Sequence, residues 1–168
     1  MAAVKAVYFI ALVLGALFAL QVGKKWMTTS LYFEVAAIEV LGNNHLPTDD
    51  VRNLISVVKG QNIVTLNMDS LRHAVLSHPW VKEATVKRAL PRTVRIEVVE
   101  RKAFAMLEGN PNVLLDEEGV VLEATGELVP AELPHISGDT SETVTLGRVV
   151  AGEKTLRALE IIKVVSAL

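Results

Sequence analysis

The feature that most constrains this chain is an uncharged apolar run close to its N-terminus. No charged residue occurs from Ala6 to Leu20, and only Lys5 and Gln21 interrupt the apolar character of Val4 to Val22. A helix of about nineteen residues rises roughly 28 Å, close to the roughly 30 Å hydrocarbon core of a bilayer. We therefore predict a transmembrane helix at residues 4–22.

The residues that follow this run suit a membrane surface. Lys24, Lys25 and Trp26 come next, and both ammonium groups and indole rings favour the interface. A cleaved signal peptide is the main alternative, although residues 16–22 contain no clear small-residue cleavage motif. A buried core helix is a third interpretation. Charge does not decide the orientation, because Lys5 and the α-amine on one side balance Lys24 and Lys25 on the other.

Composition excludes several classes of site. The chain has 168 residues, enough for one domain or two small ones, and no cysteine, so it has no disulfide and no thiol nucleophile. Its four histidines lack metal-binding spacing, and no nucleophile elbow or glycine-rich phosphate loop occurs. Asp49 and Asp50 are better explained as a helix N-terminus than as a catalytic pair. We expect no catalytic, metal or cofactor-binding residues, and hence no enzyme.

Residues after the apolar run are patterned like a folded domain. Alternation over Phe33 to Leu41 predicts a half-buried strand, with Ala36, Ile38 and Val40 on its inner face. The glycine and asparagine at positions 42 and 43 then supply a turn.

Two helices follow in this pattern. Thr48 is predicted to cap the first helix, and Gly60 to end it. Asn67 is a plausible cap for the second helix, which Pro79 terminates through its effect on the preceding residue. The first helix carries an apolar stripe at helical spacing, formed by Val51, Leu54, Ile55 and Val58.

A β-hairpin completes the pattern. Val81 to Ala89 reads as one strand, residues 90–92 as the turn, and Thr93 to Val99 as the second strand. The order is therefore β-α-α-β-β within residues 33–101. We predict an α+β domain in which two helices cover one face of a three-stranded sheet.

A resemblance to a known family rests on three runs: FEVAAIEVLGNNHLP, GQNIVTLNMDSLR and HPWVKEATVKRALPRTVRIEVVER. Together they resemble the polypeptide-transport-associated (POTRA) domain of the bacterial cell-division family FtsQ/DivIB. Residues 102–168 resemble, less sharply, the start of that family's second, β-rich domain, through the hairpin NVLLDEEGVVL and the helix EKTLRALEIIKVV. The resemblance implies a single-pass protein of the bacterial inner membrane, with residues 1–5 as a short cytoplasmic tail, its folded domains outside the cytoplasm and a role at the division septum.

Two departures from the family pattern shape the expectations. The tail before the apolar run is shorter than is usual in the family, and the chain stops at Leu168, within a predicted helix. We therefore expect residues 102–168 to be an incomplete β-domain. In the family, the missing strands dock the division proteins FtsB and FtsL, so such partners are expected by resemblance only and no docking residue can be assigned to them.

Charge is distributed unevenly along the chain. Seven basic and three acidic residues lie between Lys82 and Lys102, whereas Ala103 to Gly147 holds nine acidic residues and no Lys or Arg. These segments are either two solvated faces or surfaces for domain or peptide docking. Aromatic residues are only 5% of the chain, which argues against nucleic-acid binding. Glu100 and Arg101 are expected to fix the joint between the domains by local charge pairing.

One sheet edge is the candidate docking site. If the third strand lies centrally, Val81 to Lys87 forms an edge, and unpaired edge groups accept an extended peptide as an added strand. The alternative is an edge that is only solvated. The candidate residues are Lys82, Thr85, Val86, Lys87 and Arg88.

The leading hypothesis is a non-enzymatic, membrane-anchored scaffold that links cytoplasmic and periplasmic division proteins. The second hypothesis is a POTRA protein of outer-membrane assembly or secretion that carries a signal peptide; it predicts further POTRA repeats and alternating ten-residue strands. An anchored periplasmic hydrolase is the third, and it lacks a recognisable catalytic set.

Overall fold

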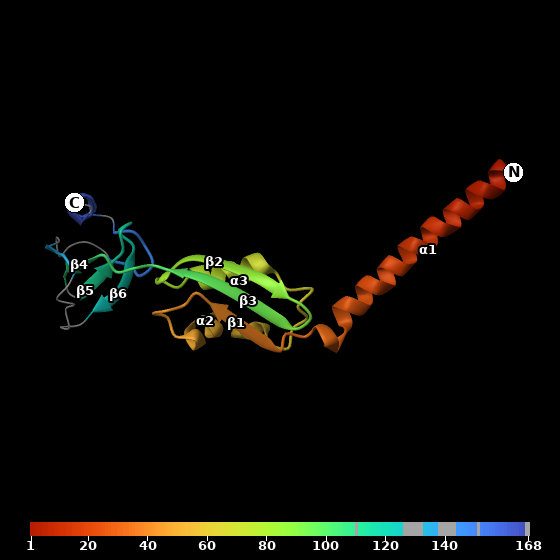
Figure 1. The fold of residues 1–168 in the computed structure, drawn as a ribbon, viewed down its shortest axis with the longest axis horizontal. Helices are drawn as coiled ribbons and strands as arrows, with labels where there is room; N and C mark the ends of the chain where they lie inside the picture. Colours follow the sequence, from red (N-terminus) through yellow and green to blue (C-terminus); the bar gives the residue numbers. More distant parts are fainter. Residues whose placement is uncertain (110, 126–132, 138–143, 151, 167–168) are drawn as a thin grey trace.

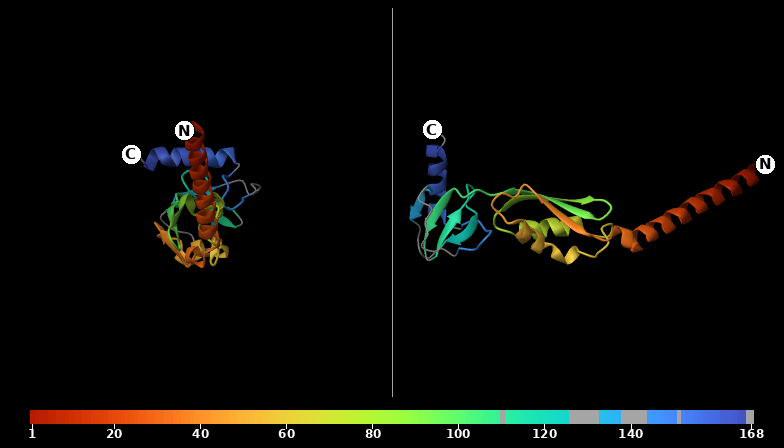
Figure 2. Two further views of the ribbon diagram at one scale, coloured as in Figure 1. Left: turned by 90° about the vertical axis from the view of Figure 1, so that its right-hand side faces the viewer. Right: turned by 60° about the horizontal axis from the view of Figure 1, so that its bottom comes forward.

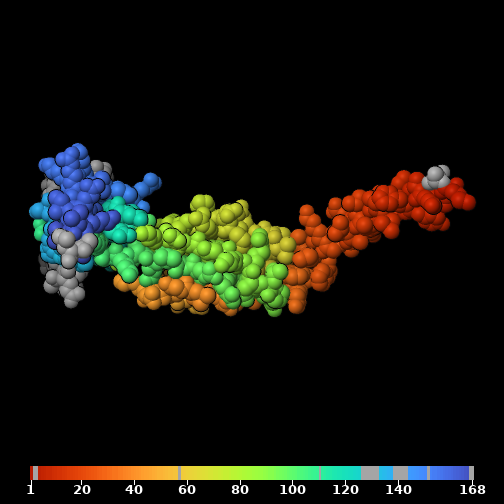
Figure 3. All heavy atoms as spheres, turned by 45° about the horizontal axis from the view of Figure 1, so that its top comes forward, coloured from red at the N-terminus to blue at the C-terminus, as the bar shows by residue number. Residues whose placement is uncertain are grey.

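The computed structural model describes residues 1–109, 111–125, 133–137, 144–150 and 152–166. The molecule is elongated, with a long helix at one end and two folded units in line with it (Figures 1 and 2). We call residues 33–101 the first unit, and the described residues after 101 the second unit. The space-filling view shows the helix protruding as a narrow rod from the first unit (Figure 3).

The protruding helix, α1, runs without a break from Ala2 to Thr29. It is long and apolar enough to cross a membrane, and the chain buries none of its apolar window. Both observations fit the predicted transmembrane helix, although α1 extends beyond residues 4–22 at each end. A short 3-10 helix, η1 (Leu31–Phe33), connects α1 to the first unit and places Phe33 in its core.

The first unit contains the three-stranded sheet that the sequence predicts. Strand β3 (Thr93–Glu100) is central, parallel to β1 (Ala37–Leu41) and antiparallel to β2 (Val81–Ala89). The predicted α+β class and the central position of the third strand are therefore confirmed. Strands β1 and β2 form the two edges.

Two helices and one 3-10 turn cover one face of this sheet: α2 (Thr48–Leu54), η2 (Ser56–Val58) and α3 (Met68–Leu76). Most of the predicted stripe is buried, since Val51, Ile55 and Val58 are at most 1% exposed, whereas Leu54 is half-buried. Asn67 caps α3 as predicted, because its side-chain oxygen accepts hydrogen bonds from the backbone N–H groups of Asp69 and Ser70.

Three local predictions are wrong. Helix α2 ends at Leu54 and not at Gly60, because Ile55 has non-helical dihedral angles and the 3-10 helix η2 follows it. The first strand begins at Ala37, because the backbone of Phe33 and Val35 hydrogen-bonds to residues 60–63 and not to β3; Ala36 is consequently exposed. Thr48 does not cap α2: it is the first helical residue, and its hydroxyl accepts a hydrogen bond from Asn43 Nδ2 at 3.0 Å.

The second unit is a four-stranded sheet, in the order β6-β5-β4-β7, with one helix beside it. The expected hairpin and helix are both present. Helix α4 buries Leu159 against the sheet and leaves Ile161, Val164 and Val165 exposed. The elements are β4 (Ala105–Glu108), β5 (Asn112–Leu115), β6 (Val121–Thr125), β7 (His135–Ser137) and α4 (Glu153–Ser166).

Candidate functional site

The candidate edge residues lie on β2 but do not share one face. Val86 is buried in the core of the first unit, whereas Thr85 and Lys87 are exposed on the face that carries no helix. Lys87 Nζ lies 2.8 Å from Glu97 Oε2 on β3. Exposed pairs of this kind are individually weak, typically below about 1 kcal/mol. Thr85 and Lys87 are thus the accessible part of the predicted set.

The other two basic candidates contact the body of the protein. Arg88 donates from Nε to the carbonyl of Ile63 at 2.8 Å and from Nη2 to that of Leu66 at 2.5 Å. Lys82 reaches the second unit, where its Nζ lies 3.0 Å from carboxylate oxygens of Glu117 and Glu118. These two side chains contact segments next to the two ends of β2, so they are not available to a partner at the sheet edge.

Arginines from the helices contact both outer strands. Arg72 of α3 donates from Nε to the carbonyl of Ala84 on β2 at 3.0 Å, and Arg52 of α2 donates similarly to Ile38 on β1 at 3.3 Å. Backbone polar groups alternate direction along a strand. The groups of Ala84 and Val86 therefore face away from β3, and those of Thr85 face towards it.

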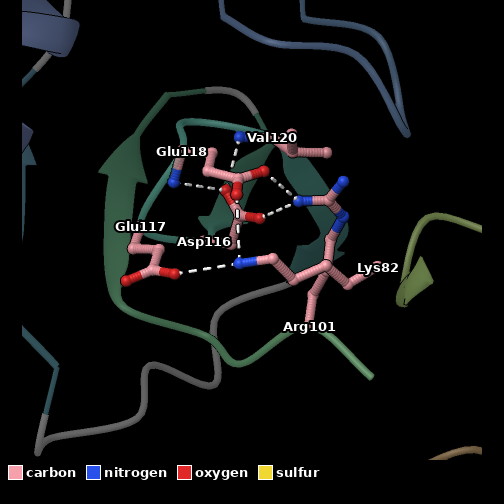
Figure 4. Close-up of polar contacts among 6 residues, drawn as sticks. All are labelled: Lys82, Arg101, Asp116, Glu117, Glu118 and Val120. Carbon is pink, nitrogen blue, oxygen red and sulfur yellow. Dashed lines mark hydrogen bonds and ion pairs between the residues drawn. The ribbon is translucent and has the colours of Figure 1, made fainter. Parts of the chain in front are cut away.

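A cluster of charged residues joins the two units (Figure 4). The side chain of Arg101 is only 16% exposed, and its Nη1 hydrogen-bonds to Asp116 and, at 2.8 Å, to Glu118. Asp116 is buried, and its Oδ1 also accepts from the backbone N–H groups of Glu118 and Val120, both at 2.8 Å. The basic end of the first unit thus docks onto the acidic β5–β6 turn of the second.

The electrostatics of the cluster follow from these contacts. Burial alone would lower the pKa of Arg101, but hydrogen bonds to Glu118 and Asp116 raise it. Hydrogen bonds to Glu118 and then Glu117 raise the pKa of Lys82. In turn, the pKa of Glu117 is lowered by Lys82, and that of Glu118 by Arg101 and Lys82. The charged forms of Lys82, Arg101, Glu117 and Glu118 are therefore the stabilised ones, as expected of a structural contact.

Glu100 and Arg101 do fix local structure, but the expected pairing needs correction because their partners differ. Glu100 accepts hydrogen bonds from the backbone N–H groups of residues 44, 45 and 46, at 2.8–2.9 Å. Burial alone would raise the pKa of Glu100, but these hydrogen bonds lower it below its ordinary value. Glu100, the last residue of β3, holds the loop after β1, and Arg101, the first residue beyond the strand, reaches the second unit.

The contacts that sequence reasoning missed are long-range. Nothing in the local pattern marks Arg72 as a partner of β2 or Asp116 as a partner of Arg101. The only signal was the excess of acidic residues after the basic hairpin, which left domain docking as one of two interpretations. Among the described residues, no group of three or more His, Asp or Glu side chains could hold a metal ion.

Comparison with known proteins decides the family. The family model "POTRA domain, FtsQ-type" matches residues 33–101. The cell division protein FtsQ of Myxococcus fulvus is 30% identical over 138 residues, which cover 82% of this chain and 49% of that relative. The chain belongs to the FtsQ/DivIB family.

Further FtsQ/DivIB relatives agree with this assignment. FtsQ of Bordetella pertussis is 36% identical over 126 residues, covering 71% of this chain and 45% of the relative. DivIB of Clostridium acetobutylicum is 28% identical over 137 residues, covering 81% of this chain and 54% of the relative. The chain thus spans about half the length of these curated relatives.

Proposed function

We propose that the chain is a non-enzymatic, single-pass membrane component of the bacterial division machinery. Its relatives are named cell division proteins. In this proposal residues 1–5 are cytoplasmic, residues 4–22 cross the inner membrane, residues 33–101 form the POTRA domain and residues 102–168 form part of the family's β-domain. The protein links cytoplasmic to extracytoplasmic division proteins at the septum, with FtsB- and FtsL-type proteins as partners.

One observation carries the anchoring part of this proposal: α1 is integrated with the first unit. The Asn62 side chain donates from Nδ2 to the carbonyl of Met27 in the last turn of α1, at 2.8 Å. Trp26 packs edge-to-face on Phe33, which lies in the core of the first unit, with ring centroids 5.8 Å apart. A helix whose end takes part in the domain's packing favours a retained anchor over a cleaved signal peptide.

The test uses the full chain with a fluorescent protein fused to its N-terminus, in dividing cells of the bacterium that encodes it. We expect a band at the septum and retention in the membrane after carbonate extraction. The matched variant replaces α1 with a cleavable signal peptide, and it should become soluble outside the cytoplasm. Even distribution of the intact fusion along the cell membrane would contradict the division role. A mature soluble chain starting near Gln21 would contradict the anchor.

We further propose that β2 is a docking edge for an extended segment of a partner protein. An edge strand offers unpaired N–H and C=O groups to an added strand. Strand β2 is an edge of the sheet and carries the exposed side chains of Thr85 and Lys87. Arg72 already occupies the carbonyl of Ala84. Strand addition therefore requires Arg72 to leave, or begins beyond Ala84 towards the hairpin turn.

A pair of proline variants tests the edge. Proline lacks an N–H, so Val86→Pro removes an outward donor and should leave the sheet folded while recruitment of partner division proteins to the septum is lost. Val40→Pro is the matched control on the other edge, β1. The carbonyl of Ile38 accepts from Arg52, so the backbone groups of Val40, two residues further along, also face away from β3. Thr85→Pro removes an inward donor and should weaken the sheet. Full recruitment by a folded Val86→Pro protein would leave β2 without a docking role.

The outer-membrane alternative receives no support from the described strands. Strands β4 to β7 are three to five residues long. Membrane-spanning β-strands need about nine to eleven residues. The family membership also favours a division role over a secretion role.

A further inference from the structure

A groove lies where α1 meets the first unit. Its volume is about 890 Å³, and α1 supplies most of the wall. The first unit contributes two residues from the segment between η2 and α3. The lining residues are Ala16, Ala19, Leu20, Gly23, Lys24, Met27 and Thr28 of α1, with Val64 and Thr65 of the first unit.

The fold sets the shape of this groove. Asn62 bonds to the end of α1 through Nδ2 and accepts a hydrogen bond from the backbone N–H of Val64 on Oδ1, at 2.9 Å. The same side chain therefore fixes both the helix and the segment that overhangs it. The helix side of the groove is open at Gly23, where an added Cβ would meet nothing within 4 Å.

The lining changes character along the helix. Ala16, Ala19 and Leu20 form an apolar floor, and Lys24 and Thr28 follow at the end nearer the first unit. From Ala16 to Lys24 the helix rises about 12 Å, at roughly 1.5 Å per residue. One leaflet contributes about 15 Å to the hydrocarbon core of a bilayer. The groove thus has the depth of one leaflet, with its basic residue at the level of the head groups.

The basic residues at this level are unpaired. Within the part of the chain that the structure describes, neither Lys24 nor Lys25 forms an ion pair with an acidic side chain. An apolar groove that ends at an unpaired ammonium group is complementary to a molecule with an acyl chain and an anionic head group. A transmembrane helix would use the apolar floor but leave Lys24 without a counter-charge.

We propose that this groove binds one anionic phospholipid from the adjacent leaflet. An acyl chain lies along Ala16, Ala19 and Gly23, and the phosphate contacts Lys24. The proposal rests on the anchoring part of the proposed function, because the groove meets lipid only if α1 lies in a bilayer. Bound lipid would fill the space between α1 and the first unit and so support the angle at which the domain leaves the membrane.

Native mass spectrometry of the full chain, released from detergent micelles, tests the proposal. Phosphatidylglycerol is the anionic probe and phosphatidylcholine the zwitterionic one, titrated separately. We expect one retained phosphatidylglycerol per chain and weaker retention of phosphatidylcholine. Lys24→Gln should weaken phosphatidylglycerol binding about fivefold, the effect of one basic residue near an anionic lipid surface. Lys25→Gln makes the same change outside the groove and should have the smaller effect.

A second pair of variants tests the apolar part. Ala16→Leu fills the groove and should remove the retained lipid, whereas Ala11→Leu makes the same change outside the lining and should not. Equal effects within either pair would overturn the proposal in favour of general surface attraction. A dimer mass that Ala16→Leu abolishes would assign the groove to a second copy of α1. Septal localisation is scored separately, so a purified chain that retains lipid but never reaches the septum would contradict only the division role.

Discussion

The two folded units differ in how completely helices cover their β-sheets. In the first, α2 and α3 cover one face of three strands, and the buried residues form one continuous cluster. In the second, four strands have one helix beside them, and their buried residues divide into two smaller clusters. The α4 face with Ile161, Val164 and Val165 is exposed. The first unit is thus closed by its own residues, whereas the second leaves apolar surface uncovered.

This contrast indicates that the first unit should have the greater folding stability. Apolar burial stabilises by roughly 25 cal/mol for each Å² removed from water, and the cluster of the first unit contains more buried residues than the two clusters of the second. The second unit compensates partly by contacts to the first, through Arg101 and Lys82. We therefore expect the second unit to depend on the first for its order, and the first to be independent.

The largest expected effect comes from separating the units. Residues 33–101 alone should unfold cooperatively on heating, because about 55 to 65 residues can suffice for one core. Residues 102–168 alone should show no cooperative transition, since α4 leaves apolar surface exposed. Circular dichroism and calorimetry of both segments provide the measurement. Equal, cooperative melting of the two isolated segments would break the comparison.

The next effect concerns the buried charge at the joint. Asp116→Asn in the full chain should destabilise the second unit by about 3 kcal/mol, because it leaves the mostly buried Arg101 short of a counter-charge. Hydrogen exchange of β5 and β6 amides measures this local stability, and the β3 amides should be unchanged. Glu118→Gln is the control: its side chain is 46% exposed, so the loss should be much smaller than that of Asp116→Asn. Similar losses in both units would mean that they unfold together.

A smaller effect is expected at Glu100 in the first unit. Its pKa is lower in the folded state than its ordinary value of 4.5. The stabilisation it gives is therefore fully present above that value and is lost as the pH falls through the folded pKa. Glu100→Gln should cost about 1 to 2 kcal/mol at pH 7 and much less at pH 3, because hydrogen bonds to the charged form are lost. Urea unfolding of residues 33–101 at both pH values measures it; a cost independent of pH would exclude the charge as its cause.

The smallest effect should come from the exposed pair on the open face. Lys87→Gln should change the free energy of unfolding of the first unit by less than about 1 kcal/mol, because its pair with Glu97 is exposed. Arg88→Gln at the neighbouring position should cost more, since Arg88 bonds to two backbone carbonyls. Urea unfolding of the same segment ranks the two. The reverse order would show that the open face, and not the covered one, holds β2.

The two units also differ in how far the sequence predicts them. Helical periodicity predicts the two helices of the first unit, Asn67 marks the start of α3, and period-two alternation predicts the hairpin. The predictions failed where distant backbone decides, as at Ala36, whose neighbours pair with residues 60–63. The partners of Arg101 and Arg88 could not be predicted, because they lie far along the chain and carry no local pattern. The groove at α1 has the same origin, since it requires Asn62 to meet the helix end.

Asn62 couples the orientation of the first unit to that of α1. The Asn62 side chain donates a hydrogen bond to the last turn of α1. A change in the tilt of α1 should therefore change the orientation of the first unit, as it would not through a flexible linker. Transmembrane helices tilt to match bilayer thickness. If α1 spans a bilayer, local thinning or thickening of that bilayer would change the tilt of α1. The far end of the elongated molecule (Figure 2) would then move, so that bilayer thickness would set the orientation of the second unit.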